Sequence, residues 1–404
     1  MTGPSDEDGA EGLVGRITVT RRTTTGRGNA LTTATQVSTS PLAYDGPVGG
    51  DGDSALETVR GPLDVLLQGF LAGRVRDLYD LDPALERVGR EVADFVRLGG
   101  KRLRPAFVYW GHRATGADHD GALLYPAGAV ELLHAFALVH DDVMDRSALR
   151  RGRPAVHTAL AEAHGEESLV GDAPWFGVGG AILAGDLAFV WSDQLFDEAP
   201  LAPDVLTRAR RVFNALRVEV MAGQYLDLRL SGKADATEAD ALHVALLKSG
   251  RYTVTRPLQL GAAVGAHDRD DRLDAALCGY GDAIGLAFQL RDDVLGLYGD
   301  PETTGKGAVE DLREGKRTVL VLRALALAGP GERAVLTAAL GNPDLQDDAA
   351  DRVRQIVESS GALESVERTL AVQQERARGR LAAVPQPARA ALEQLADLAL
   401  HRTV

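Results

Sequence analysis

Aspartates cluster at the end of one apolar segment of this sequence. Residues 129–139 are strongly apolar, and Asp141, Asp142 and Asp145 follow them directly. On a helix Asp141 and Asp145 share a face, with Asp142 beside them. Carboxylates at this spacing repel one another unless a cation lies between them, and Mg²⁺ takes oxygen ligands, keeps waters and often bridges to phosphate. The pattern predicts a magnesium site; the alternative is a solvated acidic helix end.

A second acidic pair, Asp292 and Asp293, ends another apolar segment, with Gln289 one turn before it. Basic residues stand in the loops and helix junctions around the two clusters: Lys101, Arg102, Arg104, Arg150, Arg151, Lys248, Lys306 and Lys316. Each one alone is typical of a solvated helix end, and none belongs to a GxxxxGK[ST] nucleotide-binding loop. Together the two sets predict one cavity in which carboxylates hold Mg²⁺, cations neutralise a diphosphate and apolar helix faces enclose a hydrocarbon.

Helices must position these groups. From residue 56 onward, apolar residues recur at the three- and four-residue spacing of amphipathic helices. Asp82 and Pro83 predict a helix start, and Gly99 and Gly100 a helix end. Further helices are predicted at about 101–114, 123–146, 178–198, 204–230, 237–265, 270–298, 316–328, 331–340, 346–360, 362–383 and 387–402. Strand-like alternation is scarce, so the sequence predicts an all-α domain at 56–404, a single large helical bundle.

Residues 1–55 differ in composition from the rest of the chain. They are rich in Gly, Thr, Ser, Asp and Pro and have few large apolar side chains, so burial cannot offset the entropy of ordering them. We predict a disordered leader. The alternative is a docking segment for a protein partner, with Ile17, Val19, Arg21 and Arg22 as contacts; the sequence does not identify that partner.

The composition excludes several classes of protein. The chain has 404 residues and a formal net charge of -14, which argues against general nucleic-acid binding. Its single cysteine, Cys278, excludes an internal disulfide and a cysteine-based metal cluster. The first residues are acidic and Gly-rich, which argues against a signal peptide. The apolar segment 178–191 is interrupted by Asp186 and falls short of the roughly 20 residues that span a bilayer. A soluble cytoplasmic protein without stable membrane insertion is expected.

Six motifs stand in a family-specific order along the chain: GGKRLRP, DDVMD with RRGRP behind it, AGQYLDL, KSG, FQLRDD and GKGAVEDLREGKRT. From about Arg60 to the C-terminus the chain resembles the trans-isoprenyl diphosphate synthase (polyprenyl synthetase) family, and within it the bacterial geranylgeranyl diphosphate synthases. The resemblance implies helices around a central cavity, usually in a homodimer. It also implies about three Mg²⁺ ions per active site.

The resemblance also implies roles for individual residues. The metal ligands would be Asp141, Asp142, Asp145, Asp292 and Asp293. Isopentenyl diphosphate would contact Lys101, Arg104, His134 and Arg151, and the allylic diphosphate Arg150, Lys248, Lys306 and Lys316. Ser249 and Gln289 would lie beside the allylic cation, with Gln224 and Asp227 ordering metal-bound waters or Arg150. The catalytic set would be Asp141, Asp145, Asp292, Lys248 and Arg150. Gly296 departs from the family pattern, because many members have a third aspartate there.

The activity that the resemblance implies is chain elongation by ionisation, condensation and elimination. An allylic diphosphate (dimethylallyl, geranyl or farnesyl) would condense with isopentenyl diphosphate. Phe136 and Ala137, five and four positions before Asp141, favour geranylgeranyl diphosphate as the product. A farnesyl or longer polyprenyl diphosphate synthase is an alternative. So are a terpene cyclase and a non-catalytic regulatory or cargo subunit recruited through the leader.

Overall fold

The computed structural model describes residues 54–118, 121–266, 268, 270–299 and 310–400. The chain divides after Pro41, and everything described belongs to the second unit, Leu42–Val404. The predicted leader and its candidate docking residues therefore lie almost entirely outside the described residues. The contacts begin at Ser54, whose side chain accepts a hydrogen bond from the Glu57 N–H at 3.2 Å, and the Ala55 carbonyl accepts one from Trp110 Nε1 at 2.7 Å.

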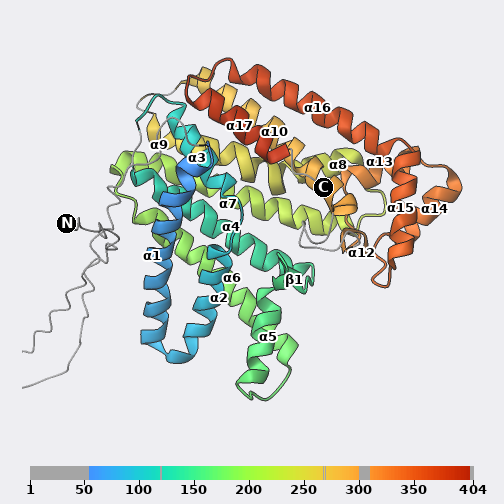
Figure 1. Ribbon diagram of the computed structural model, residues 1–404, viewed down its shortest axis with the longest axis horizontal. Coiled ribbons are helices and arrows are strands. Elements are labelled where there is room, and N and C mark those ends of the chain that lie inside the picture. Colours follow the sequence, from blue (N-terminus) through green and yellow to red (C-terminus); the bar gives the residue numbers. More distant parts are fainter. Residues whose placement is uncertain (1–53, 119–120, 267, 269, 300–309, 401–404) are drawn as a thin grey trace, which may run out of the picture. The chain divides into compact units, whose positions relative to one another are not determined.

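The described residues are almost entirely helical, which confirms the predicted all-α class (Figure 1). The first half contains α1 Glu57–Leu81, η1 Pro83–Leu85, α2 Glu86–Arg97, α3 Leu103–Arg113, η2 Gly121–Leu123, α4 Leu124–Met144, α5 Val156–Glu166, α6 Ala173–Asp197 and α7 Pro203–Ser231. The second half contains α8 Glu238–Val244, η3 Ala245–Thr255, α9 Arg256–Gly265, α10 Asp271–Tyr298, α12 Glu310–Arg313, α13 Val319–Leu327, α14 Pro330–Ala339, α15 Asp347–Ser359, α16 Ala362–Leu381 and α17 Ala388–Leu400. Strands β1 Leu149–Arg150 and β2 Arg153–Pro154 pair antiparallel.

Helix α4 lies at the centre of the core and carries the first aspartate cluster at its C-terminal end. Its apolar side chains cover all sides of the helix, and Val130, Leu132 and Leu133 are fully buried. A helix that is apolar all round must be enclosed by other elements. Helices α1, α3 and α6 pack around it, so its last turn is held rigidly at the edge of the core.

The helix that carries the KSG motif is not regular. The run 238–265 is continuous, as predicted, but its middle part η3 is π-helical. Such wide turns are rare and recur at functional sites. Gly250 in η3 crosses Gly285 of α10 so closely that a Cβ on Gly285 would overlap the backbone of η3, and a Cβ on Gly250 would lie only 3.0 Å from the Gly285 carbonyl carbon. The crossing fixes the distance between η3 and α10.

Three local features differ from the sequence predictions. Helix α5 was not predicted; it is short and depends on burying Val156 and Leu160 rather than on a strong periodic signal. Helix α6 begins at Ala173 rather than 178, because Asp172 caps its first turn through the Trp175 N–H at 3.0 Å. The RRGRP segment forms the β1–β2 hairpin rather than a plain loop.

Helix α6, which contains the apolar segment 178–191, is longer than that segment and long enough to cross a membrane, contrary to the prediction from the sequence. Two stretches are long and apolar enough by length and composition, Gly121–Met144, which is largely buried, and Ala173–Asp197, which is not. The second is helix α6. Asp186, in the middle of α6, keeps a side chain that is 60% exposed. Asp193 forms ion pairs with Arg210 and Arg217 of α7, which favours a protein or water environment over lipid for this helix.

Candidate active site

A cavity of about 1030 Å³ opens where α3, α4, α7, η3 and α10 meet. Asp141 at the end of α4 and Asp292 near the end of α10 both line it. One aspartate of each cluster, distant in sequence, therefore faces the same space, whereas Asp145 and Asp293 are not among the lining residues. Apolar side chains also line it, with Phe136, Val220 and Phe288 among them.

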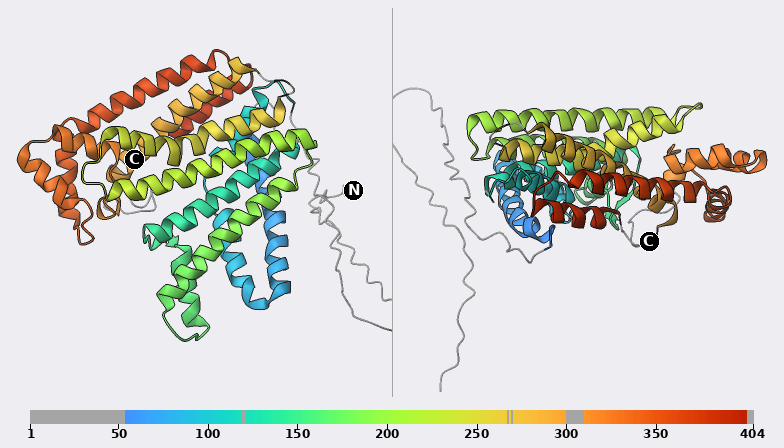
Figure 2. Two further views of the ribbon diagram at one scale, coloured as in Figure 1. Left: turned by 180° about the vertical axis from the view of Figure 1, so that it is seen from behind. Right: turned by 90° about the horizontal axis from the view of Figure 1, so that it is seen from above.

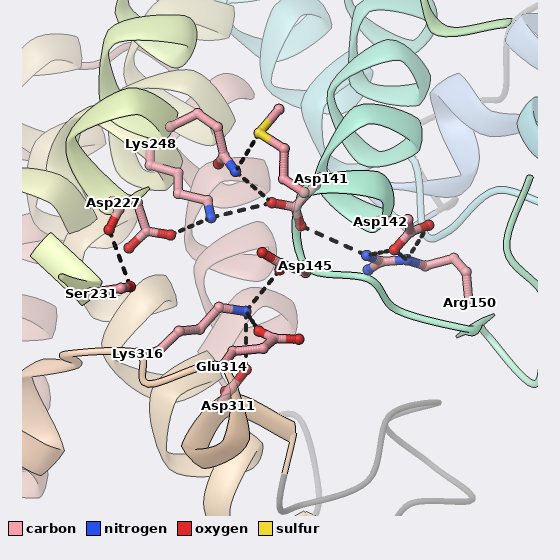
Figure 3. A network of polar contacts seen from close by, with 12 residues as sticks. Asp141, Asp142, Asp145, Arg150, Asp227, Ser231, Lys248, Asp311, Glu314 and Lys316 are labelled. Carbon is pink, nitrogen blue, oxygen red and sulfur yellow. Dashed lines mark hydrogen bonds and ion pairs between the residues drawn. The ribbon is translucent and has the colours of Figure 1, made fainter. Parts of the chain in front are cut away.

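The first cluster is held by cations in the structure (Figure 3). Gln224 Nε2 donates to Asp141 Oδ1 at 2.8 Å, and Lys248 Nζ lies 3.4 Å from the same oxygen. Lys248 also donates to Asp227 at 2.7 Å. Burial opposes the charge of Lys248, but Asp141 and Asp227 outweigh that effect and raise its pKa. The ammonium is therefore a permanent positive charge beside Asp141.

Arg150 reaches the cluster from the hairpin. Its Nε donates to Asp142 Oδ1 at 2.9 Å, and its Nη2 lies 3.7 Å from Asp141 Oδ2. The tight turn that follows uses left-handed backbone at Arg151 (φ 54°) and Gly152 (φ 72°). Asp142 is fully buried and does not line the cavity. Its position fits an anchor for Arg150 better than a direct contact with a ligand in the cavity.

Lys316 holds the third aspartate. Its Nζ donates to Asp145 Oδ2 at 3.0 Å and to Asp311 Oδ1 at 3.1 Å, and it also pairs with Glu314. Burial opposes the charge, but Asp311, Asp145 and Glu314 hold the pKa of Lys316 well above its usual range. Lys316 therefore links the segment around α12 to the end of α4 (Figure 3).

The second cluster has one partly exposed and one buried carboxylate. Asp292 lines the cavity, whereas Asp293 is 8% exposed and accepts a hydrogen bond from the Gln289 amide at 2.7 Å. Burial, with the nearby carboxylates adding to it, raises the pKa of Asp293 to about 7. Asp311 lies so close to Gly296 that a Cβ there would overlap its carboxylate. A carboxylate from α12 thus lies beside the position where many members have a third aspartate.

These donors fit Mg²⁺ by their chemistry. Asp141, Asp145 and Asp292 offer the hard oxygen ligands that Mg²⁺ prefers. Within the residues that the structure describes, no three metal-ligating side chains enclose an ion by themselves. Mg²⁺ generally keeps several waters and takes further ligands from substrate phosphates.

Comparisons with known proteins agree with this geometry. A sequence model of the family described as polyprenyl synthetase matches residues 86–359. The chain belongs to this family. It is 32% identical over 316 residues to a geranylfarnesyl diphosphate synthase of Aeropyrum pernix, covering 77% of this chain and 91% of that one. A geranylgeranyl diphosphate synthase of Sulfolobus acidocaldarius is 31% identical over 293 residues, covering 72% and 79%.

The family's fold is also matched in solved structures. A geranylgeranyl pyrophosphate synthase of Corynebacterium glutamicum, solved with isoprenyl diphosphate and magnesium, superposes with a TM-score of 0.80 at 35% identity. The match covers 84% of this chain and 98% of that one. The resemblance to polyprenyl synthetases drawn from the six motifs is confirmed.

The structure brings most of the predicted substrate residues to the cavity. Its lining includes Lys101, Arg104, His134, Arg150, Arg151, Gln224, Lys248 and Ser249. Gln289 is bonded to Asp293 instead and is not among the lining residues. Lys306 lies outside the described residues. Arg102 proves to be a structural anchor, since it is 4% exposed and paired with Asp64 and Glu131.

Three residues at the polyprenyl synthetase site were missed from the sequence. Asp311 and Glu314 stand in the quoted GKGAVEDLREGKRT motif, where their spacing from Lys316 was a usable signal. Tyr252 gave no signal, because an aromatic residue on a helix is usually core. Its hydroxyl lies 2.9 Å from His134 Nδ1, and it lines the cavity.

Proposed function

We propose that this polyprenyl synthetase elongates an allylic diphosphate by condensation with isopentenyl diphosphate, and that geranylgeranyl diphosphate is its main product. One observation carries the proposal: one aspartate of each cluster, several cations and the apolar side chains of Phe136, Val220 and Phe288 line a single cavity. A diphosphate with a hydrocarbon tail has the same division of polarity. The magnesium and isoprenyl diphosphate found in the C. glutamicum relative support this assignment.

In this proposal Asp141, Asp145 and Asp292 hold Mg²⁺, with Asp293 behind them. The bound metal would neutralise the charge that develops on a departing diphosphate. Lys248, Arg150 and Lys316 now neutralise the aspartates of the first cluster. Arg150 and Lys248 line the cavity, so these two cations would serve the allylic diphosphate without reorganising, whereas Lys316 is not among the lining residues.

The remaining chemistry needs exclusion of water more than a protein base. When the diphosphate leaves, the allylic cation would be attacked by the double bond of isopentenyl diphosphate. The proton lost afterwards can pass to the departed diphosphate. Apolar walls such as Phe136 and Phe288 would keep water from trapping the cation.

The length of the product would depend on the wall beneath Asp141. Phe136 packs on His140 and Phe189, with ring centroids 4.8 and 5.1 Å apart, while Ala137 leaves space. One aromatic residue beside one small residue supports the geranylgeranyl product. Relatives that make geranylgeranyl and geranylfarnesyl chains show that family membership alone does not decide the length.

The exposed side of α6 and α7 supports a homodimer. Apolar side chains recur along it, including Trp175, Ile182, Leu183 and Val190 on α6 and Val218, Met221, Tyr225 and Leu228 on α7. Figure 2 shows α6 and α7 on the viewer's side when the molecule is seen from behind. Exposed apolar side chains of this kind mark a protein interface, and Met221, Tyr225 and Leu228 also line the cavity. A second copy of this chain is the partner we assign to it. Cytoplasmic location and a protein partner for residues 1–55 stay predictions.

The decisive test is product analysis. The purified chain is incubated with isopentenyl diphosphate and each allylic primer in turn, with Mg²⁺ or with a chelator. We expect prenyl diphosphates that elongate to geranylgeranyl diphosphate, only when Mg²⁺ is present. A hydrocarbon formed from geranylgeranyl diphosphate alone would indicate a cyclase instead. A chain inactive until a partner is added would indicate a regulatory subunit.

A further inference from the structure

Tyr252 contacts two residues assigned to isopentenyl diphosphate. It lies in η3 and is 4% exposed. Its hydroxyl lies 2.9 Å from His134 Nδ1, and the Arg104 guanidinium lies over its ring, 4.5 Å from the centroid. Arg104 is held further by a 2.9 Å hydrogen bond to Thr253 Oγ1. One short segment of η3 therefore sets the positions of both side chains.

The charge state of His134 limits what it can donate. Burial lowers its pKa well below the usual range, and the cationic Arg104, Arg151, Arg150 and Arg102 lower it further. The imidazole is therefore neutral, with one donor and one acceptor nitrogen. Burial raises the pKa of Tyr252, so its hydroxyl keeps its proton.

Only one tautomer of His134 suits a diphosphate. Diphosphate oxygens accept hydrogen bonds, so the ring nitrogen that meets them must carry a proton. Because Nδ1 is occupied by Tyr252, Nε2 is the nitrogen left for a ligand in the cavity. If Nδ1 carried the proton, the Nε2 lone pair would face the anion and repel it. A hydroxyl that donates to Nδ1 selects the productive tautomer.

We propose that Tyr252 is a positioning residue, which orients His134 with its Nε2–H toward the diphosphate of isopentenyl diphosphate and steadies Arg104 beside it. The inference rests on the proposed function. Tyr252 itself need not touch the reacting atoms. Gly250, two residues before Tyr252, packs against Gly285 and fixes the position of η3 there. The backbone that carries the Tyr252 hydroxyl is therefore held in place.

The first test is Tyr252→Phe, which removes the hydroxyl and keeps a ring beneath Arg104. One neutral hydrogen bond corresponds to roughly a three- to tenfold change in binding. We expect KM for isopentenyl diphosphate to rise by about that factor, with kcat and the KM of the allylic primer nearly unchanged. Tyr252→Leu also removes the ring and is expected to raise the same KM further.

A double-mutant cycle separates positioning from packing. If Tyr252 acts through His134, then Tyr252→Phe has no further effect on KM in a His134→Ala background. Equal effects in both backgrounds would overturn the proposal. Nitrogen NMR of the histidine side chains gives a second readout, since Tyr252→Phe should shift His134 toward a mixture of tautomers.

Tyr280→Phe is the matched control. Tyr280 is also buried, and its hydroxyl donates to the Leu392 carbonyl at 2.6 Å, but it does not line the cavity. It should change stability without changing KM for isopentenyl diphosphate. If the parent chain makes prenyl products and Tyr252→Phe leaves KM for isopentenyl diphosphate unchanged, the role of Tyr252 is contradicted but the proposed function is not. A parent chain that makes no such products contradicts the proposed function instead.

Discussion

Asp141 has two roles at the scale of single residues. It is an assigned metal ligand, and it also contacts Gln224, Lys248 and Arg150. We expect Asp141→Asn to lower kcat by about 10²–10³, as the loss of one preorganised electrostatic contact does elsewhere. Steady-state kinetics at saturating Mg²⁺ would measure this. Asp351→Asn, which breaks an exposed ion pair with Arg354, is the control and should keep full turnover. Near-normal turnover in Asp141→Asn would refute the metal assignment.

His134 makes stability depend on pH. Because its pKa is lowered in the folded protein, the unfolded chain binds this proton more readily. Stability from this group is therefore fully present above the ordinary histidine pKa of about 6.5 and is lost as the pH falls below it. We expect His134→Gln to lose less unfolding free energy than the parent between about pH 7 and pH 5. Urea unfolding across this range is the measurement. His243→Gln, an exposed position, should behave as the parent does.

Phe136 and Ala137 are expected to control chain length. Phe136→Ala removes a ring from the wall, so longer products should form; Ala137→Phe fills the space and should shorten them. Chromatography of the products measures both. Tyr79→Ala, which removes an exposed aromatic side chain from α1, is the control. An unchanged product distribution in both wall variants would mean that other helices set the length.

At the scale of elements, α10 and α12 approach each other closely at Gly296 and Asp311. A Cβ on Gly296 of α10 would overlap the Asp311 carboxylate, so that side chain would have to move to make room for it. Gly296→Asp would restore the aspartate found in many members, but it would add overlap and like charge. We expect it to destabilise the fold by about 1–3 kcal/mol, the usual range for overpacking. Urea unfolding checks the loss, and Asp311→Ala in the same chain should recover part of it. A stable single variant that keeps Asp311 would contradict the overlap.

The sequence predicts long helices better than local departures from regular structure. Helices α4 and α10 were predicted because their apolar residues recur at helical spacing over long segments. The aspartates at the ends of these segments were placed by the same pattern. The π-helical form of η3 was not predictable, since it depends on how Gly250 meets Gly285 in another helix. The pairing of Asp142 with Arg150 was hidden for a similar reason. A hairpin, not spacing along the chain, brings Arg150 back to the end of α4.

At the scale of the whole molecule, the exposed face of α6 and α7 should decide assembly. Leu183 on α6 is 62% exposed among other apolar side chains. We expect Leu183→Arg to convert a dimer into a monomer, because a buried unpaired charge opposes association. Sedimentation velocity would measure the mass. Val170→Arg, at a 96% exposed position outside α6 and α7, is the control and should leave the mass unchanged. A parent chain that is already monomeric would refute the homodimer.

The crossing of Gly250 and Gly285 has a consequence for how such a protein can be modified. Main-chain contact, rather than any side chain of the hydrocarbon wall, locates the segment that carries Lys248 and Tyr252. Substitutions on the cavity-lining faces of α4 and α7 can therefore change the apolar wall that contacts the hydrocarbon, while Lys248 and Tyr252 keep their positions. Redesign for a new prenyl length should begin on those two helices and leave the glycine pair untouched.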